Sequence, residues 1–390
     1  MDNFTFYNPT RIVFGKDKTA NIGKVTAPWG QRVMLLYGQG SVKKTGILDT
    51  VKQSLEQSGI TVFECGGVQP NPVLSFAQQA IEAFRADKLD AIVAVGGGSV
   101  IDTAKTIAAG VPYDGNVWDF FSGKAKVESA VPVTVVLTLP AAASEMNSGG
   151  VITNEQTQQK FNIMGDPLYP KASILDPVNT FSAPLHHSLY GVVDAMVHLL
   201  EGYFNTTSHN TALQDRYAEG IIRTLMESAS VIKTEPDNYE ARSNIMWGAT
   251  LAFNGLAPCG LGATGFPMHM IEHSLSAIYD VSHGAGLAMI LPGWMRYRLL
   301  NSPERFARFA HTVFDIQPTA DPVADAKQGI VALEKWLGSM DIPANLQQGG
   351  IPVAEIPQIA QNAVMLAQKW GLKEYTTDVI TEVLQYSAGE

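Results

Sequence analysis

The sequence predicts an α/β fold with a parallel sheet in its first half and an all-α fold in its second half. Up to about residue 183, short apolar runs alternate with amphipathic helical stretches, whereas long helical periods with few β-branched runs follow from residue 184 onward. Alternation of strand and helix is typical of a parallel sheet with right-handed crossovers. We therefore expect an α/β domain over residues 1–183 and an all-helical domain over residues 184–390, and a chain of 390 residues is long enough for both.

The individual elements follow in order along the chain. The expected strands are apolar runs that end at Gly or Pro, namely RVMLLYG (32–38), TVFECGGV (61–68), DAIVAVGGG (90–98) and VTVVLTLP (133–140). Continuous apolar runs of this length predict strands that are buried on both faces. Helical periodicity predicts helices at ILDTVKQSLEQSG (47–59) and VLSFAQQAIEAFRAD (73–87), and in the second half at NTALQDRYAEGIIRTLMESASVI (210–232) and YEARSNIMWGATLAFNG (239–255).

Composition and charge exclude several classes of partner. The net charge of −10 argues against nucleic acids and anionic membranes, because both bind basic surfaces. The two cysteines, Cys65 and Cys259, are too few for a disulfide framework, which favours a reducing compartment. The first residues do not have the pattern of a secretory signal, and the apolar stretches are too short to cross a bilayer. We expect a cytoplasmic protein.

Two glycine-rich turns in the first half are candidates for binding phosphate groups. GGGSVIDTAK (96–105) and YGQGSVKKTG (37–46) each follow an expected strand, and the first also opens an expected helix. Glycines at such turns let backbone amides approach a pyrophosphate, and the helix N-terminus adds a partial positive charge. Ser99 can cap the helix and donate its hydroxyl. A tight turn with a good N-cap explains the motif equally well, and neither motif has the G-x-G-x-x-G spacing of an ordinary Rossmann fold.

Five residues in the second half form a candidate metal site. Asp194 and His198 are four residues apart, as are His269 and His273, and His283 follows shortly after them. A spacing of four places two side chains on one face of a helix. Four of these five side chains can complete one shell of a carboxylate and three imidazoles. The remaining histidines have no comparable pairing with other donors and are expected to be ordinary core or surface residues: His186, His187, His209 and His311.

Because it has both the glycine-rich turns and the cluster of histidines, the chain resembles the iron-containing (group III) alcohol dehydrogenases, in particular the branch of NADPH-dependent butanol dehydrogenases and aldehyde reductases. The resemblance extends over essentially the whole chain, through NPTRIVFG (8–15), PNP (70–72), GGGSVIDTAK, LDP (175–177), GVVDAMVH (191–198), the H-x3-H-x9-HG spacing from His269, and ILP (290–292). It implies an N-terminal nucleotide-binding domain and a C-terminal metal-binding domain, an architecture shared with dehydroquinate synthases.

The resemblance also implies roles for the candidate metal site. Asp194, His198, His269 and His283 match the metal ligands of the family, and this ligand set suits Fe²⁺ or Zn²⁺. His273 matches a histidine near the metal. A histidine there can exchange the proton of the alcohol oxygen, so we expect His273 to be the catalytic acid–base group.

The cofactor residues implied by the resemblance lie in the first half. They comprise a pyrophosphate turn with the acidic residue one helical turn later, a loop beside the nicotinamide, a lysine on the ribose and an adenosine contact: Gly97, Gly98, Ser99 and Asp102; Thr138, Leu139 and Asn147; Lys160; and Asn71. Without the family, Lys160 is by default a solvated surface lysine, and Asn71 is by default a turn residue.

The chain departs from the family pattern at two positions. The family usually has P-A-T-G-S-E where this chain has PAAASE (140–145), so a threonine hydroxyl expected on a phosphate is missing at Ala142. The loss of one neutral hydrogen bond is expected to cost about 1 kcal/mol of cofactor affinity. Gln39 replaces a glycine that is common in this branch, which changes the expected geometry of the first turn.

The first turn predicts which dinucleotide is used. Members of the family that prefer NAD tend to carry an acidic residue after the first strand, and a carboxylate there would repel a 2′-phosphate. This chain instead has backbone amides, a hydroxyl and lysine charge at this turn, contributed by Gly38, Gln39, Gly40 and Ser41, with Lys43 and Lys44 close behind. These groups favour a 2′-phosphate, and we therefore expect NADP(H) rather than NAD. The alternative is a helix start that touches no ligand.

The expected reaction is hydride transfer between nicotinamide C4 and a small alcohol or aldehyde of the butanol and butanal type, polarised by the metal. A polyol dehydrogenase of the glycerol type is the closer alternative, and a non-catalytic nucleotide-binding regulator is a more distant one. The N-terminal segment TFYNPTRIVFG is expected to supply an edge strand, and the resemblance implies a homodimer formed through it.

Overall fold

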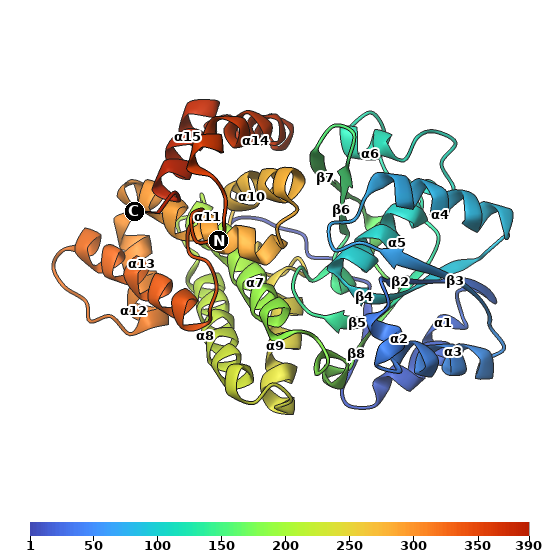
Figure 1. Cartoon of the computed structure of the whole chain (residues 1–390). Helices are drawn as coiled ribbons and strands as arrows, with labels where there is room; N and C mark the ends of the chain where they lie inside the picture. The colour runs from blue at the N-terminus through green and yellow to red at the C-terminus, as the bar shows by residue number, and fades with distance from the viewer. Residues whose placement is uncertain (390) are drawn as a thin grey trace. The chain divides into compact units, whose positions relative to one another are not determined.

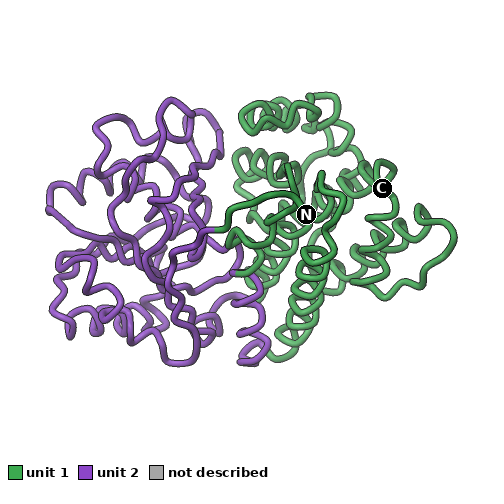
Figure 2. Tube along the Cα trace, turned by 180° about the vertical axis from the view of Figure 1, so that it is seen from behind, with its two compact units in different colours: residues 1–6, 185–235, 251–390 green, residues 7–184, 236–250 purple. Residues whose placement is uncertain are grey.

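The computed structural model describes residues 1–389 and divides into two compact units, shown in different colours in Figure 2. The α/β unit comprises Tyr7–Pro184 and Pro236–Thr250. The helical unit comprises Met1–Phe6, Leu185–Glu235 and the chain from Leu251 onward. The boundary falls after Pro184, one residue later than a boundary between residues 183 and 184, and the division differs from two continuous domains in two further places. The first six residues belong with the helical unit, and a segment of the second half belongs with the α/β unit.

The α/β unit is built on a six-stranded parallel sheet with the strand order β1-β8-β5-β4-β2-β3 (Figure 1). Every adjacent pair of strands in this sheet is parallel. The strands are β1 (Arg11–Phe14), β2 (Arg32–Gly38), β3 (Thr61–Val68), β4 (Ala91–Gly97), β5 (Val133–Leu139) and β8 (Ala172–Leu175). The helices are α1 (Ile22–Thr26), α2 (Ser41–Lys44), α3 (Ile47–Gln57), α4 (Leu74–Ala86), α5 (Gly98–Gly110) and α6 (Trp118–Ser122).

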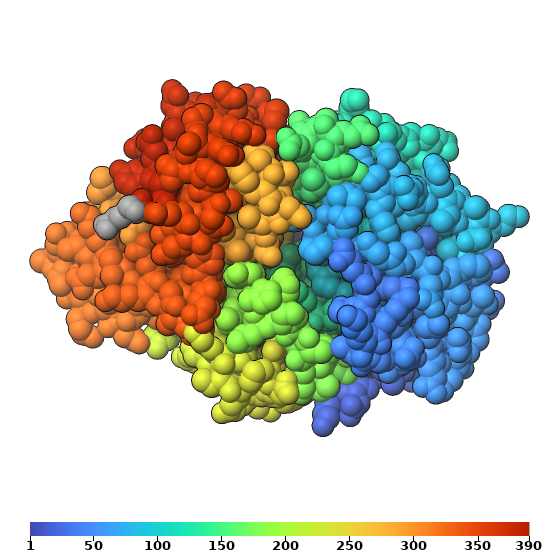
Figure 3. Space-filling view, viewed as in Figure 1, coloured from blue at the N-terminus to red at the C-terminus, as the bar shows by residue number. Residues whose placement is uncertain are grey.

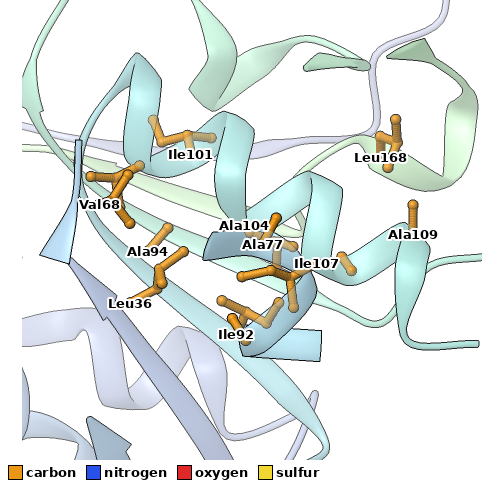
Figure 4. Packing of buried hydrophobic residues seen from close by; sticks show 14 of the residues in the cluster. Leu36, Val68, Ala77, Ile92, Ala94, Ile101, Ala104, Ile107, Ala109 and Leu168 are labelled. Carbon is orange, nitrogen blue, oxygen red and sulfur yellow. The ribbon is translucent and has the colours of Figure 1, made fainter. Parts of the chain in front are cut away.

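Helices cover both faces of this sheet because successive residues of a buried strand point to opposite sides. On β2, Leu36 faces the layer of α4 and α5, whereas Leu35 faces the layer of α1 and α3. The close view in Figure 4 shows Ile101 and Ala104 of α5 over Leu36 and Ala94 of the strands. The central strands β2, β4 and β5 are therefore buried on both faces, as their continuous apolar runs predict.

The prediction of two-sided burial is wrong for β3. Its side chains are mostly exposed or half-buried, because β3 is the last strand of the sheet and pairs only with β2. Two glycines and a glutamate within this run, TVFECGGV, already indicate that it is less apolar than its neighbours.

An antiparallel hairpin interrupts the alternation of strands and helices and was not among the expected elements. It consists of β6 (Gly149–Asn154) and β7 (Gln159–Met164) and packs against α5 through β6. Figure 1 shows the hairpin beside α5, apart from the main sheet. This hairpin carries Lys160, and Asn147 lies just before it.

The helical unit holds most of the remaining helices. These are α7 (Leu185–Asn205), α8 (Ala212–Thr234), α10 (Pro267–Tyr279), α11 (His283–Arg298), α12 (Pro303–Phe314), α13 (Pro322–Ser339), α14 (Ile356–Trp370) and α15 (Thr377–Tyr386). Helix α11 packs against α7, α10 and α15, and α14 packs on α10. Figure 3 shows α14 and α15, coloured red, at the surface of this unit. Within residues 1–389, no helix combines the length and the apolar character required to cross a bilayer.

Helix α9 (Tyr239–Ala252) is helical as expected but belongs almost entirely to the α/β unit. Met246 lies in the same apolar cluster as α4 and α5. Thr250 donates its hydroxyl to the buried Glu145 carboxylate at 2.5 Å. One apolar contact and one buried hydrogen bond therefore attach α9, a helix of the second half of the chain, to the α/β unit. Helical periodicity in the sequence does not reveal such long-range contacts.

Candidate metal centre and nucleotide-binding turns

The five candidate metal residues come together inside the helical unit, although they belong to three helices. Asp194 and His198 lie on α7, His269 and His273 lie on α10, and His283 is the first residue of α11. The Oδ1 atom of Asp194 lies 3.2 Å from His198 Nδ1, 3.5 Å from His269 Nε2 and 3.6 Å from His283 Nε2. One carboxylate oxygen is thus the common neighbour of three imidazole nitrogens.

A close approach of two helices places His283 at this point. A Cβ atom on Gly284 would lie 2.0 Å from the backbone oxygen of Tyr190 on α7. Only glycine leaves room for that contact, so the residue after His283 allows the start of α11 to pack directly on the α7 backbone. Gly284 therefore follows His283 for a steric reason: the close helix contact that it permits brings the imidazole of His283 on α11 to the carboxylate of Asp194 on α7.

The polar atoms at the centre of this cluster lack hydrogen-bond partners. Among the residues that the structure describes, Asp194 Oδ1, His198 Nδ1 and His269 Nε2 are buried and find no hydrogen-bond partner. Buried polar groups without a partner are rare and costly, and a bound cation satisfies a carboxylate oxygen and imidazole nitrogens together. The donor set of one carboxylate and several imidazoles suits Zn²⁺ or Fe²⁺. The cluster therefore fits a divalent metal.

Two further carboxylates orient the histidines from behind. Glu201 Oε1 lies 3.1 Å from His269 Nδ1 and also accepts a hydrogen bond from the backbone amide of the same histidine at 3.0 Å. Glu272 contacts the ring Nδ1 atom of His283 with its Oε2 atom. Metal-binding histidines commonly donate their second ring nitrogen to a carboxylate, which fixes the tautomer and turns the other nitrogen to the metal. Both Nε2 atoms indeed face Asp194.

The protonation of the cluster follows from its burial and its charges. Burial alone would raise the pKa of Asp194, but the three nearby imidazoles hold it below its usual range. Burial lowers the pKa of His198 to about 3, so its ring is neutral, as a metal ligand requires. Burial would also lower the pKa of His269, but the neighbouring carboxylates of Asp194 and Glu201 raise it to about 9. A metal that binds His269 must displace this proton.

His273 lies next to the cluster. Its ring centroid is 5.7 Å from that of His283 and 5.5 Å from that of Trp370 on α14. The acidic and imidazole groups of the region form two sets of mutually close atoms, one of Asp194, His198 and His269 and one of Glu272, His273 and His283. His273 therefore neighbours a candidate ligand and is absent from the set around Asp194.

The surroundings of His198 are aromatic. The Phe253 ring stacks on the His198 ring at a centroid distance of 4.3 Å, and Phe266 packs edge-on against Phe253 at 5.4 Å. The side chain of His283 is 25% exposed, compared with about 5% for those of His198 and His269, so the cluster opens toward His283. Met268 is fully buried.

The predicted cofactor residues gather at the carboxyl ends of the parallel strands of the α/β unit. They follow or end β2, β3, β4 and β5, or lie on the adjoining helices and hairpin: Gly38, Gln39, Gly40, Ser41 and Lys44; Asn71; Gly97, Gly98, Ser99 and Asp102; and Thr138, Leu139, Asn147 and Lys160. The strand order reverses direction between β2 and β4, because β3 lies on one side of β2 and β4 on the other. Both glycine turns lie at this switch point, where open α/β sheets bind ligands.

The turn after β4 differs in detail from the sequence prediction. Gly97, and not Ser99, is the N-cap of α5. The Ser99 hydroxyl instead donates to the backbone oxygen of Pro70, which ties the start of α5 to the segment after β3. In that segment Asn71 accepts a hydrogen bond from Lys160 Nζ at 3.3 Å. Lys160 is buried, so the default interpretation as a solvated surface lysine is wrong.

Asp102 makes hydrogen bonds within the protein. Its Oδ1 atom accepts from the Ser144 hydroxyl at 2.5 Å, and its Oδ2 atom accepts from the Val151 amide at 3.1 Å. One turn further along α5, Lys105 is fully buried and bonds Asn147 and Gly149. The side chains of Asp102 and Lys105 on α5 thus hold the loop between β5 and β6 in place through hydrogen bonds.

The turn after β2 carries the lysines on which the NADP(H) prediction depends. Gly40 has a φ of 122°, a conformation open to glycine, and it starts the short helix α2. Lys43 lies 3.7 Å from Glu64 and 4.9 Å from the centre of the Tyr37 ring. Tyr37 also donates its hydroxyl to Glu64 at 2.9 Å. Lys44 is exposed, and within residues 1–389 its ammonium group makes no hydrogen bond or ion pair.

Three buried charged residues near the two sites escaped the sequence analysis, and each had a detectable signal. Glu201 follows Asp194 by seven residues, so it lies on the same face of α7. Glu272 lies between His269 and His273 in the sequence, and its partner is in the next helix. Lys105 follows Asp102 by three residues on α5. An acidic or basic residue at helical spacing from a candidate ligand is the pattern that would have found them.

Comparisons with known proteins match almost the whole chain. The model of the iron-containing alcohol dehydrogenases matches residues 9–177, and the model of the C-terminal part of that family matches residues 188–387. The probable NADH-dependent butanol dehydrogenase 1 of Bacillus subtilis is 40% identical over 390 residues, which is 99% of this chain and 100% of the relative. The NADPH-dependent aldehyde reductase YqhD of Escherichia coli is 38% identical over 363 residues, or 92% of each chain. The crystal structure of NADH-dependent butanol dehydrogenase A from Thermotoga maritima has a TM-score of 0.95 and 41% identity, and the match covers 100% of this chain and 99% of that one.

Proposed function

Because the chain belongs to the iron-containing alcohol dehydrogenase family, we propose that it reduces small aldehydes to primary alcohols, with NADPH as the hydride donor and one divalent metal in the helical unit. Family membership makes the chain an NAD(P)-dependent alcohol dehydrogenase, and the substrate, the preferred dinucleotide, the metal and the site residues are the proposed parts. The observation that supports the metal most directly is the set of buried atoms without partners around Asp194 Oδ1.

The metal ligands in this proposal are Asp194, His198, His269 and His283. Fe²⁺ and Zn²⁺ both suit these donors, and either supplies a Lewis acid that polarises the oxygen of the substrate. Glu201 and Glu272 hold two of the imidazoles in the ligand orientation. Because His283 is the most exposed of the candidate ligands, the substrate is expected to reach the site from its side.

His273 is the proposed proton donor for the alcohol oxygen. It lies beside His283 and packs against Trp370, so its ring is held next to the exposed side of the cluster. Imidazole titrates close to neutral pH, which suits a group that gives up and recovers a proton in each turnover.

The dinucleotide is held by the turns after β2 and β4 in this proposal. Backbone amides of Gly97 and Gly98 at the start of α5 face the pyrophosphate, while Thr138, Leu139 and Asn147 flank the nicotinamide. Lys160, held by Asn71, contacts the ribose. Asp102 acts through the loop that it holds, since both of its oxygens already accept hydrogen bonds from Ser144 and Val151.

The preference for NADPH rests on the turn after β2. The turn itself contains no carboxylate, and Lys44, which makes no ion pair with the described residues, supplies positive charge for a 2′-phosphate, whereas Glu64 partly offsets the charge of the nearby Lys43. The names of the relatives support both cofactors, because the butanol dehydrogenases of Bacillus subtilis are named for NADH and the aldehyde reductase of Escherichia coli is named for NADPH. We therefore expect NADPH to be preferred, and Lys44→Ala to reduce that preference several-fold.

The proposed substrates are short, mainly apolar aldehydes of the butanal type. Phe253 and Phe266 line the side of His198 with aromatic carbon, and such a surface binds an alkyl chain better than a polyol. A diol is the second candidate, because 1,3-propanediol dehydrogenase of Citrobacter freundii is 28% identical over 93% of this chain. We further propose a cytoplasmic homodimer, in which the exposed edge of β1 is the strand available for pairing.

One experiment tests these proposals together. The protein is stripped of metal, reloaded with Fe²⁺ or Zn²⁺ separately, and assayed for butanal-dependent oxidation of NADPH and of NADH, with 1,3-propanediol as an alternative substrate in the oxidative direction. We expect metal-dependent turnover with butanal and a higher kcat/KM for NADPH than for NADH. Higher kcat/KM with NADH would overturn the cofactor proposal, and activity that persists without metal would overturn the metal site.

A further inference from the structure

Lys105 is a fully buried cation in the middle of α5 and is neither a proposed metal ligand nor a proposed contact of the dinucleotide. Its Nζ atom donates three hydrogen bonds: to the backbone oxygen and the side-chain Oδ1 of Asn147, both at 2.9 Å, and to the backbone oxygen of Gly149 at 2.7 Å. An ammonium group has three hydrogens. Each of them therefore has its own acceptor, and all three acceptors belong to one short segment.

Two buried carboxyl groups of the same unit act on the charge of Lys105, and burial raises the pKa of each of them. Asp102 and Glu145 both favour the charged form of this lysine, and they oppose the burial that lowers its pKa to about 8. Glu145 is itself buried and accepts a hydrogen bond from Thr250. Lys105 thus has two separable properties, the charge that offsets these carboxylates and the three hydrogen bonds that orient Asn147 and Gly149.

The three hydrogen bonds determine where the side chain of Asn147 lies. The Asn147 Oδ1 atom accepts from Lys105 and from the Gly149 amide, so its Nδ2 atom points the other way and donates to the backbone oxygen of Ala142 at 3.0 Å. This arrangement closes the loop between β5 and β6. The same helix begins at the turn proposed for the pyrophosphate, so a single rigid element connects that turn to Asn147.

We propose that Lys105 is a positioning residue for the nicotinamide, which it orients through Asn147 while taking no part in binding the ADP-ribose portion of the dinucleotide. This inference rests on the proposed function, because it takes Asn147 as a residue beside the nicotinamide. Lys105 touches neither substrate nor cofactor and acts only through the loop that it holds. Loss of its hydrogen bonds displaces the nicotinamide relative to the substrate, and a misplacement of about 1 Å can cost on the order of 100-fold in rate.

The test compares two variants with the wild-type protein. Lys105→Met keeps the length of the side chain and removes both the charge and the hydrogen bonds. The double variant Lys105→Met with Glu145→Gln restores the charge balance without restoring the hydrogen bonds, and it keeps the contact with Thr250. Lys24→Met, an exposed lysine on α1, is the matched control. Each protein is assayed for kcat and KM with its preferred dinucleotide, and for the Kd of the ADP-ribose fragment that lacks nicotinamide, with the 2′-phosphate if NADPH is preferred.

We expect kcat to fall about 10- to 100-fold in both Lys105 variants, with the Kd of the fragment within about twofold of wild type. The double variant is expected to recover thermal stability without recovering kcat. An unchanged kcat in Lys105→Met would overturn the inference, as would recovery of kcat in the double variant, because charge balance would then be the whole role. An equal loss of fragment binding would also overturn it, since the effect would then be general damage to α5. Failure of the proposed function is a different result: the wild-type protein itself would neither bind nor oxidise a nicotinamide dinucleotide.

Discussion

The two units of the molecule differ in whether the buried polar groups of their proposed sites have hydrogen-bond partners within the protein. In the α/β unit, the charged side chain of Asp102, beside one of the proposed nucleotide-binding turns, already has partners in Ser144 and Val151. In the helical unit, the atoms around Asp194 Oδ1 are buried without partners. We therefore expect the proposed nucleotide site to be organised before a ligand arrives, and the proposed metal site to be completed by its ligand. Accordingly, we expect the helical unit to depend on its ligand for stability as well as activity, and the α/β unit to depend on its ligand only for activity.

The largest expected effect is the loss of one imidazole from the metal cluster. His269→Ala and His283→Ala are each expected to release the metal and to lower kcat by at least on the order of 10³-fold, because a Lewis acid contributes several kcal/mol to the stabilisation of charge. Metal content by mass spectrometry and aldehyde-dependent oxidation of the dinucleotide measure both effects. Binding of the dinucleotide, followed by fluorescence, should stay within about twofold because the turns belong to the other unit. A variant that keeps a full equivalent of metal would contradict the ligand assignment.

A second prediction concerns the stability that each ligand provides. Saturating Fe²⁺ or Zn²⁺ at about 1,000 times its Kd is expected to raise the free energy of unfolding by about 4 kcal/mol. Hydrogen exchange should locate the protection in α7, α10 and α11, which hold the atoms without partners. The dinucleotide should protect the turns after β2 and β4 and leave these helices unchanged. Protection by the metal spread evenly over both units would remove the contrast between them.

Part of this arrangement was predictable from the sequence, and the reasons are physical. The central strands could be predicted because strands buried on both faces have continuous apolar sequences. The positions of Asp194 with His198 and of His269 with His273 on single helices could be predicted because a spacing of four residues places two side chains on one helical face. The edge position of β3, the β6–β7 hairpin and the attachment of α9 to the α/β unit were missed. Each depends on a partner far away in the sequence, as Thr250 depends on Glu145, and local periodicity carries no information about such partners.

A smaller effect is expected from the carboxylates that support the metal ligands. Glu272→Gln removes the charge next to His283 Nδ1 and retains nearly the same shape, so metal affinity should fall about 10- to 100-fold while the fold is kept. Competition with a chelator of known affinity measures this change. Glu334→Gln, at an ion pair with Arg296 on the surface of the same unit, is the matched control and should leave metal affinity unchanged. Equal affinities of Glu272→Gln and wild type would show that Glu272 does not support the site.

The smallest expected effect tests whether the organisation of the α/β site has a cost of its own. Ala143, in the loop between β5 and β6, has a φ of 50° and a ψ of 25°, the left-handed conformation that glycine adopts more readily. A Cβ atom in this conformation costs about 1–2 kcal/mol. Its removal also loses one buried methyl group, about 0.8 kcal/mol, and gives the unfolded chain about 0.4–1 kcal/mol of added freedom, so the gain and the losses nearly cancel. We expect Ala143→Gly to change the free energy of unfolding by less than about 0.5 kcal/mol. Ala141→Gly, two residues earlier and without a positive φ, should lower it by about 0.5–1 kcal/mol. Urea denaturation of both variants measures the difference, and a loss at Ala143 larger than the loss at Ala141 would show that the loop is not strained at Ala143.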